Sequence, residues 1–204
     1  MAPKKKRKFP TSIGDSLLSE ERLKMIRPEE VVGAFGFREG ESVVDLGCGP
    51  GAFLKALSEA VGEKGRVYAV DIQEPFINMA KRLAAEKGLR NIEFVVSREK
   101  AIPLEDDAAD GALMVNVLHE LDGNYTLREL IRILKKGAKL GVVEWEKAKS
   151  PMGPPLSERY SEEESEALLR ENGFEIRRLF KVGTYHYAVE AHKPGSARKK
   201  AGKR

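Results

Sequence analysis

Residues 43–51 read VVDLGCGPG and residues 67–72 read VYAVDI, and these two stretches decide the fold. Each begins with β-branched, apolar residues that are typical of a buried strand. The first strand ends in an acid followed by three glycines at alternate positions, which let the backbone turn sharply and approach a ligand closely. Residues 52–61 then carry apolar side chains at helical spacing, so a helix would point its N-terminus at that ligand. The pattern predicts a strand–loop–helix unit that binds a nucleoside cofactor.

The details of the loop indicate which cofactor. Its glycines follow a G-x-G-x-G spacing, whereas a dinucleotide fingerprint reads G-x-G-x-x-G and binds a pyrophosphate. Asp45 would repel a pyrophosphate but suits a cationic ligand that bears an ammonium and a sulfonium. Asp71 ends the second strand, where a carboxylate can accept both hydroxyls of a ribose. Both stretches resemble motif I and the following acidic motif of class I S-adenosylmethionine-dependent methyltransferases. An ordinary glycine-rich turn is the alternative.

The resemblance implies a set of cofactor contacts. In the family, the loop after the third strand contacts adenine, usually through an acid, and here Arg98 stands at the acid's position. Either the neighbouring Glu99 binds the adenine amino group or the backbone alone does, and a solvated charged loop is the alternative. We expect Cys48 to pack near the cofactor as a small residue, with a nucleophilic role as the alternative. The predicted cofactor-binding residues are Asp45, Gly47, Cys48, Gly49, Gly51, Asp71, Ile72, Ser97, Arg98, Glu99 and Asn116.

The whole chain alternates strand and helix patterns, which predicts an α/β fold with a doubly wound, mostly parallel sheet. A proline-rich stretch at 146–160 predicts a loop without regular structure, and Ser161 with Glu164 predicts a capping box. Two β-rich stretches separated by Gly183-Thr184 predict a closing hairpin, so the last strand is antiparallel. The class I methyltransferase fold has seven strands and this arrangement. The predicted strands are 43–46, 66–71, 92–96, 111–117, 139–145, 175–182 and 185–192; the main helices are 52–61, 75–88, a helix from Leu127 through Leu134 to Gly137, and 161–172.

We expect one methyltransferase domain over residues 9–192, with a helical cover at 19–36 and a core at 41–192. Residues 1–8 hold five basic residues and residues 193–204 hold six, with no acid in either stretch. Such blocks predict solvated, disordered tails. They either only solubilise the chain or hold nucleic acid or an anionic membrane by charge.

The composition of the chain indicates its source and its location in the cell. The run PKKKRKF at 3–9 resembles a nuclear-import signal, but the body is poor in Asn and Gln and rich in charged residues, as in heat-adapted proteins. We therefore expect a thermophilic prokaryotic source and a cytoplasmic protein, nuclear only if the source is eukaryotic and the run is used. No apolar run is long enough to span a bilayer. The single cysteine excludes a disulfide framework and a multi-thiolate metal site, and we expect no metal.

The runs ALMVNVLHELDG at 112–123 and KKGAKLGVVEW at 135–145 narrow the resemblance. They are similar to the broad family that includes quinone-biosynthesis C-methyltransferases and many small-molecule methyltransferases. In this arrangement Asn116 to His119 lie where strand four ends and face the methyl group. His119 is the predicted general base, because its pKa in water lies near neutrality, and a structural histidine is the alternative. Glu144, at the end of strand five, is the second predicted catalytic residue, and a structural role is again the alternative.

The resulting hypothesis is a methyltransferase that moves a methyl group from S-adenosylmethionine to a small acceptor by in-line displacement. Two alternatives stay open: an RNA or protein methyltransferase recruited through its basic tails, and a non-catalytic cofactor-binding protein. We expect residues 19–35 and 146–160 to cover the substrate side of the cofactor. The acceptor and the oligomeric state are not indicated by the sequence.

Overall fold

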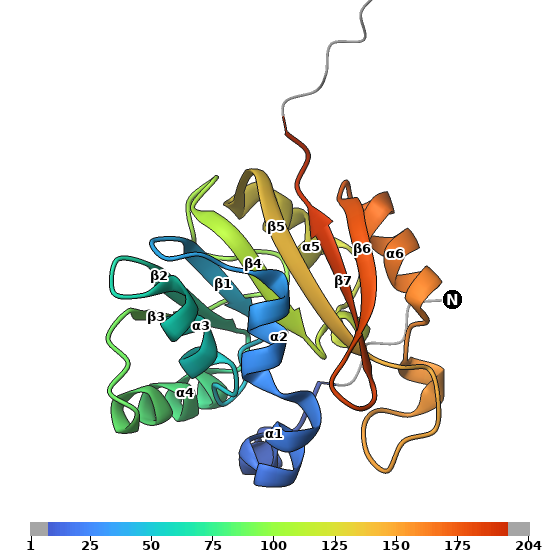
Figure 1. Cartoon of the computed structure of the whole chain (residues 1–204), viewed down its shortest axis with the longest axis horizontal. Coiled ribbons are helices and arrows are strands. Elements are labelled where there is room, and N and C mark those ends of the chain that lie inside the picture. Colours follow the sequence, from blue (N-terminus) through green and yellow to red (C-terminus); the bar gives the residue numbers. More distant parts are fainter. Residues whose placement is uncertain (1–7, 196–204) are drawn as a thin grey trace, which may run out of the picture.

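The computed structural model describes residues 8–195, so the predictions for the basic tails and the import-like run lie almost entirely outside the described residues. A central sheet carries helices on both faces (Figure 1). In chain order the elements are η1 (Thr11–Leu18), α1 (Glu20–Ile26), α2 (Pro28–Phe35), β1 (Ser42–Leu46), α3 (Leu54–Val61), β2 (Arg66–Asp71), α4 (Glu74–Glu86), β3 (Ile92–Val96), β4 (Ala109–Val115), η2 (Leu118–Glu120), α5 (Tyr125–Ile133), β5 (Leu134–Trp145), η3 (Leu156–Glu158), α6 (Glu162–Glu171), β6 (Glu175–Val182) and β7 (His186–His192).

The seven strands are ordered β3-β2-β1-β4-β5-β7-β6. Strands β1 to β5 are parallel to one another, and β7 is antiparallel to both of its neighbours, β5 and β6. The order reverses between β1 and β4, and open α/β sheets bind ligands beyond the carboxyl ends of the strands at such a point. In Figure 1 this edge lies at the bottom, where α1 and the orange loop after β5 are also found. The predicted doubly wound sheet with an antiparallel last strand is confirmed.

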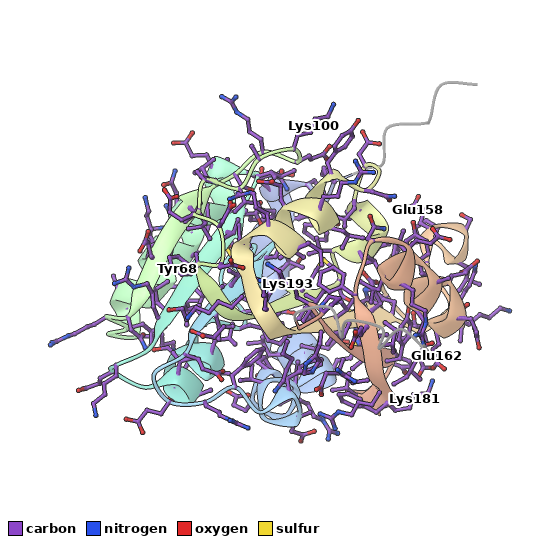
Figure 2. All side chains as sticks on the ribbon, turned by 90° about the horizontal axis from the view of Figure 1, so that it is seen from above. Tyr68, Lys100, Glu158, Glu162, Lys181 and Lys193 are labelled. Carbon is purple, nitrogen blue, oxygen red and sulfur yellow. The ribbon has the colours of Figure 1, made fainter. Side chains whose placement is uncertain are left out.

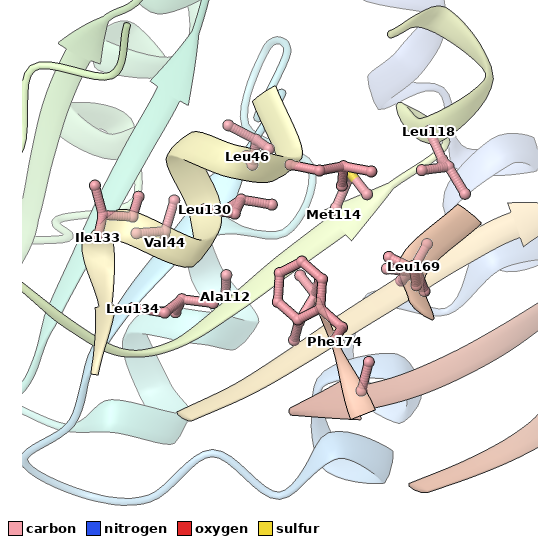
Figure 3. Close-up of a cluster of buried hydrophobic side chains, with 14 of the residues drawn as sticks. Val44, Leu46, Ala112, Met114, Leu118, Leu130, Ile133, Leu134, Leu169 and Phe174 are labelled. Atoms are coloured by element: carbon pink, nitrogen blue, oxygen red, sulfur yellow. The ribbon is translucent and has the colours of Figure 1, made fainter. Parts of the chain in front are cut away.

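Two apolar layers hold the helices on the sheet. Helices α2, α3 and α4 cover one face, and α5 and α6 cover the other. Figure 3 shows the second layer, in which Leu130 and Ile133 of α5 meet Val44 and Ala112 of the sheet. These side chains are completely or almost completely buried. Since burying such a side chain stabilises by about 1.5–3 kcal/mol, both layers contribute strongly to rigidity beneath the carboxyl edge.

The C-terminal helix begins as the sequence predicted. The Ser161 hydroxyl accepts from the Glu164 amide at 3.2 Å, and the Ser161 amide donates to the Glu164 carboxylate at 2.6 Å, which completes the capping box. Lys181 of β6 pairs with Glu162 of α6 at 3.1 Å, and Figure 2 shows these two labelled side chains side by side. The helix is thereby joined to the outermost strand.

Several predicted boundaries are wrong. The helix predicted to run through Leu134 to Gly137 ends at Ile133, because Leu134 already pairs with Ala109 of β4. Strand β4 begins at Ala109 and ends at Val115, two residues earlier than predicted at each end. The 146–160 stretch contains a short 3-10 helix, η3. A further 3-10 helix, η1, was not predicted at all.

The innermost residues of both predicted tails contact the domain. Lys193 continues the sheet through its backbone, which bonds with Gly137 and Ala138 at 2.9 Å each. Lys8 lies against Glu99. Among residues 8–195, no helix combines the length and apolar character needed to cross a bilayer.

Candidate active site

The glycine loop after β1 has two differently used glycines. The amides of Gly47 and Cys48 donate to the Val70 carbonyl at 2.7 and 3.1 Å, which ties the loop to β2. Gly47 and Gly49 have φ of 68° and 52°, in the left-handed region that favours glycine. A Cβ at Gly47 would lie 2.4 Å from Val117, whereas a Cβ at Gly49 would meet only Leu17, at 3.7 Å. The absence of a side chain at Gly47 therefore lets Val117 pack against the loop, whereas Gly49 borders open space in which a ligand can lie.

Asp71, the last residue of β2, faces this loop. One carboxylate oxygen accepts from the Gly49 amide at 2.9 Å, and the other accepts from the Gln73 amide at 2.8 Å. Burial raises the pKa of Asp71, and the bonds from these backbone amides act in the opposite direction. Each carboxylate oxygen has two lone pairs, so both retain capacity for a further donor. Asp71 can thus orient the loop and still accept two ligand hydroxyls.

Asp45 is a buried acid with an incomplete set of partners. Its side chain is 2% exposed, and its Oδ2 atom has no hydrogen-bond partner among residues 8–195. Burial, and then the charge of Asp71, raise the pKa of Asp45 to about 7. A buried carboxylate is costly unless a donor or a cation meets it. The site therefore favours a ligand that brings a positive charge to Asp45.

We expect the affinity for a cationic ligand to depend on pH through Asp45. Below its pKa of about 7 the carboxyl is protonated, and a ligand that needs the anion must displace that proton. Affinity should fall ~10-fold per pH unit below pH ~7 and level off above it. Calorimetric titration with S-adenosylhomocysteine from about pH 8 to about pH 6 measures this. Asp45→Asn should bind more weakly with a flat profile, and an equally flat wild-type profile would exclude Asp45 as the group responsible.

A cavity of about 120 Å³ that opens to solvent lies over the loop. We call it the glycine-loop cavity. Asp45 and Cys48 line an adjoining recess together with Gly47 and Gly49, and Gly51 packs toward Leu54 instead. Burial raises the pKa of the Cys48 thiol well above its usual value, which does not suit a nucleophile. The other predicted residues on the cavity wall are Gly47, Gly49, Asp71, Ile72, Ser97, Arg98, Glu99 and Asn116.

The loop after β3 forms one end of this cavity. The Ser97 amide donates to the Asp71 carbonyl at 2.9 Å, which continues the hydrogen bonding between β2 and β3 by one residue. Arg98 is exposed and bridges back to Ala101. Glu99 is partly buried, and Lys8 Nζ contacts its carboxylate at 2.6 Å. Both Arg98 and Glu99 therefore lie on the cavity wall, and the Glu99 carboxylate is paired with Lys8.

The N-terminal segment covers the cavity mouth, a feature that sequence reasoning missed. The Phe9 amide donates to Glu120 at 3.3 Å, and the Gln73 side chain donates to the Phe9 carbonyl at 3.1 Å. The Phe9 ring lies 6.5 Å from that of Phe76. The expected cover at 19–36 therefore begins earlier in the chain. The one signal was Phe9 itself, an aromatic residue directly after a basic run.

The two predicted catalytic residues lie together. His119 Nδ1 is 2.9 and 3.0 Å from the two oxygens of Glu144, whose side chain is fully buried. The backbone amides of His119 and Trp145 also donate to Glu144, at 3.3 and 3.2 Å. The carboxylate is held at the end of β5 and fixes the imidazole through Nδ1. His119 Nε2 is the nitrogen away from Glu144, 3.9 Å from Glu120.

His119 borders a second cavity, which we call the Trp145 cavity. It shares Lys8, Phe9, Arg22, Asn116 and Glu120 with the glycine-loop cavity, so the two spaces adjoin. Its wall combines apolar side chains, such as those of Phe9 and Trp145, with charged and polar ones, such as that of Glu158. The remaining lining residues are Pro10, Ile13, Ser16, Ser19, Glu21, His119, Trp145, Met152, Gly153, Pro154, Pro155 and Glu158.

Asn116 stands between the two cavities. It follows β4 with a φ of 57°, a conformation that asparagine tolerates better than most residues. Its Nδ2 lies 3.3 Å from His186 Nε2, and its Oδ1 has no partner within residues 8–195. Burial, and then the charges of Arg22 and Arg159, lower the pKa of His186 to about 3. His186 is therefore neutral and can hold the amide, whose oxygen remains for a ligand.

The loop after β5 forms one wall of the Trp145 cavity and is held by a buried arginine. Arg159 is 5% exposed. Its guanidinium donates to the carbonyls of Pro154, Glu146, Ala148 and Met152 and to the Ser150 hydroxyl, at 2.8–3.2 Å. These bonds hold the loop in place as one wall of the cavity.

We expect Arg159→Gln to release this wall. Amides in residues 146–158 should exchange ~100-fold faster or more, because bonds to a charged donor are worth about 1.5–3 kcal/mol each. Hydrogen exchange followed by mass spectrometry measures the change. Arg170→Gln, which removes an exposed guanidinium of α6, is the matched control and should leave the loop unchanged. Unaltered exchange in Arg159→Gln would mean that other contacts fix the loop.

Comparisons with known proteins show the family to which the chain belongs. Residues 15–168 match the model of the ubiE/COQ5 methyltransferase family. The Escherichia coli ubiquinone/menaquinone biosynthesis C-methyltransferase UbiE is 33% identical over 127 residues, covering 61% of this chain and 49% of that relative. The chain therefore spans about half the length of the curated relatives it matches.

Solved structures extend the likeness over most of the chain. A SAM-dependent methyltransferase from Aquifex aeolicus is 40% identical, with a TM-score of 0.88 over 91% of this chain and all of that one. The [4+2]-cyclase SpnF is 20% identical, with a TM-score of 0.72 over 83% of this chain and 81% of that one, and shows likeness of fold alone. Since the family model covers most of the chain, the protein belongs to the ubiE/COQ5 methyltransferase family, a group of class I S-adenosylmethionine-dependent methyltransferases.

Proposed function

We propose that this protein is an S-adenosylmethionine-dependent methyltransferase that acts on a small, planar acceptor with an ionisable hydroxyl. The single observation that carries the proposal is the adjoining pair of cavities. One is lined by the glycine loop and Asp71, and the other is lined by His119, which Glu144 holds from behind the wall. Asn116 lies on both walls, where a methyl group would pass from one ligand to the other.

The residues present fit the cofactor. The space beside Gly49 accepts a ligand without a clash, and Asp71 has lone pairs for two ribose hydroxyls. The unpartnered oxygen of Asp45 suits the ammonium of the methionine part. When bound, S-adenosylmethionine would supply a methyl group already activated by the positive sulfonium. The protein then needs mainly to align the acceptor and exclude water.

The Trp145 cavity supplies the acceptor side. Glu144 holds the Nδ1–H of His119, which leaves Nε2 as the nitrogen that can take a proton from the acceptor hydroxyl. Removing that proton raises the electron density of the acceptor, so that its oxygen or a conjugated carbon can attack. The name of UbiE, a C-methyltransferase, supports carbon as the acceptor atom. Phe9 and Trp145 provide flat apolar surface and keep water out.

A small acceptor is favoured over RNA or protein. The Trp145 cavity is walled by Phe9, the loop around Met152 and Trp145, which leaves room for a small molecule. The alternative of recruitment by basic tails rests on residues that the structure does not describe. A cytoplasmic location is part of the proposal.

Incubation with methyl-labelled S-adenosylmethionine and a cell extract tests the proposal. Labelled products are sorted into small organic molecules, lipid, RNA and protein. We expect label among small organic or lipid-soluble molecules, and its loss with Asp71→Ala. Label in RNA or protein that disappears when residues 1–7 and 196–204 are deleted would favour the alternative. No transfer together with tight cofactor binding would favour a non-catalytic protein.

A further inference from the structure

Arg22 of α1 reaches the place where the two cavities meet. It lines both cavities and also the recess that contains Asp45 and the glycine loop. Its guanidinium carbon lies 5.7 Å from the centroid of the Trp145 ring, within the range of a cation–π contact. The side chain is partly buried. A positive charge is thus placed beside both predicted ligands.

Among the residues that the structure describes, no acid compensates this charge. Within residues 8–195, the Arg22 guanidinium forms no ion pair, whereas Lys8 pairs with Glu99. The buried carboxylates nearby are engaged elsewhere: Glu144 holds His119, and Glu120 accepts from the Phe9 amide. Burial lowers the pKa of Arg22, and no neighbouring acid acts in the opposite direction. Since a buried charge is costly without a partner, the partner is expected to come with a ligand.

A second arginine contacts the same ring as Arg22. The guanidinium carbon of Arg159 lies 5.2 Å from the centroid of the Trp145 ring, and the hydrogen bonds of this guanidinium go to carbonyls and a hydroxyl. His186 is neutral and adds no negative charge. The recess is lined by both Arg22 and Asp45, whose Oδ2 has no hydrogen-bond partner within residues 8–195, so an uncompensated cation and an unsatisfied acid both border it.

We infer that Arg22 binds a ligand carboxylate at the junction of the two cavities. The planar guanidinium can lie against Trp145 and present an edge of N–H donors to both oxygens of a carboxylate. The inference rests on the proposed function, which supplies two sources of this group: the α-carboxylate of the cofactor, or a carboxylate on the acceptor. Their chemistry is the same, and the experiment distinguishes them.

Calorimetric titration with S-adenosylhomocysteine and its decarboxylated analogue tests the cofactor source. If the cofactor carries the carboxylate, the wild-type protein should prefer S-adenosylhomocysteine by roughly 10- to 100-fold, and Arg22→Gln should lose this preference. Arg22→Lys should keep part of it, because the charge remains but the bidentate geometry is lost. Lys24→Gln removes an exposed charge from the same helix and is the matched control, expected to behave as wild type.

Titration of the S-adenosylhomocysteine complex with benzoate tests the acceptor source. Benzoate binding that Arg22→Gln abolishes, with the preference between cofactor analogues unchanged, would assign the carboxylate to the acceptor. The inference is overturned if Arg22→Gln, folded by its melting temperature, matches wild type in both titrations. It is also overturned if the wild-type protein neither prefers S-adenosylhomocysteine nor binds benzoate. Failure of the proposed function would give a different result. The wild-type protein would then not bind S-adenosylhomocysteine at all, while benzoate binding to the free protein would still require Arg22.

Discussion

His119→Ala is expected to lower kcat by about 10²- to 10⁴-fold, the usual contribution of a positioned general base. The imidazole lies on the wall of the Trp145 cavity, and Glu144 fixes its Nδ1 at 2.9–3.0 Å. Alanine removes the proton acceptor without touching the glycine loop, so the Kd for S-adenosylhomocysteine should stay within about twofold. Steady-state methyl transfer, measured with the acceptor found by the labelling experiment, gives kcat, and calorimetry gives Kd.

Glu144→Gln provides the comparison for this first result. Its amide keeps the shape of the carboxylate but presents one acceptor oxygen to the three N–H groups that now converge on Glu144. We expect a kcat between those of wild type and His119→Ala. An unchanged kcat in folded His119→Ala would make His119 a structural residue, and proton removal would need another group or none.

Asp71→Ala is expected to weaken cofactor binding by about 1.5–3 kcal/mol, the range for hydrogen bonds to a charged group. The variant removes the predicted acceptor of the ribose hydroxyls and also the acceptor of the Gly49 amide at 2.9 Å. The loop therefore loses an anchor at the point where the ligand approaches. Calorimetric titration with S-adenosylmethionine measures the loss.

Asp110→Asn is the control for Asp71→Ala. Asp110 also accepts from a backbone amide, that of Ser42 at 3.0 Å, but it lies at the opposite end of β1 from the glycine loop. Its substitution should leave cofactor affinity unchanged. Wild-type affinity in Asp71→Ala would refute the assignment of the ribose site, as would a preference of the wild-type protein for NAD.

Local sequence patterns predicted the strands, turns and helix caps, because each of these features depends on only a few neighbouring residues. The strand that carries Asp45, the glycines that require positive φ, and the Ser161 capping box depend on neighbours in sequence, and the structure contains all of them. The helix predicted to extend to Gly137 failed for the opposite reason. Its end is set by pairing of Leu134 with Ala109, a tertiary contact that overrides apolar spacing.

The site could be predicted only where the residues sit at strand ends. His119 and Glu144 were each visible, but 25 residues separate them, and nothing in the sequence shows that one holds the other. Arg22 and Phe9 were missed because they enter the site from segments outside the strand–helix alternation. Trp145 had a usable signal: it ends β5 next to Glu144, so it had to lie near the same edge.

The most direct test of the account is a crystal structure of the complex with S-adenosylhomocysteine. We expect the ribose hydroxyls within about 3 Å of the Asp71 carboxylate, the usual hydrogen-bond distance. The sulfur should lie beside Asn116, facing the cavity that contains His119 and Trp145. A ligand bound away from the glycine loop, or one whose sulfur points away from the Trp145 cavity, would contradict the proposed methyl transfer.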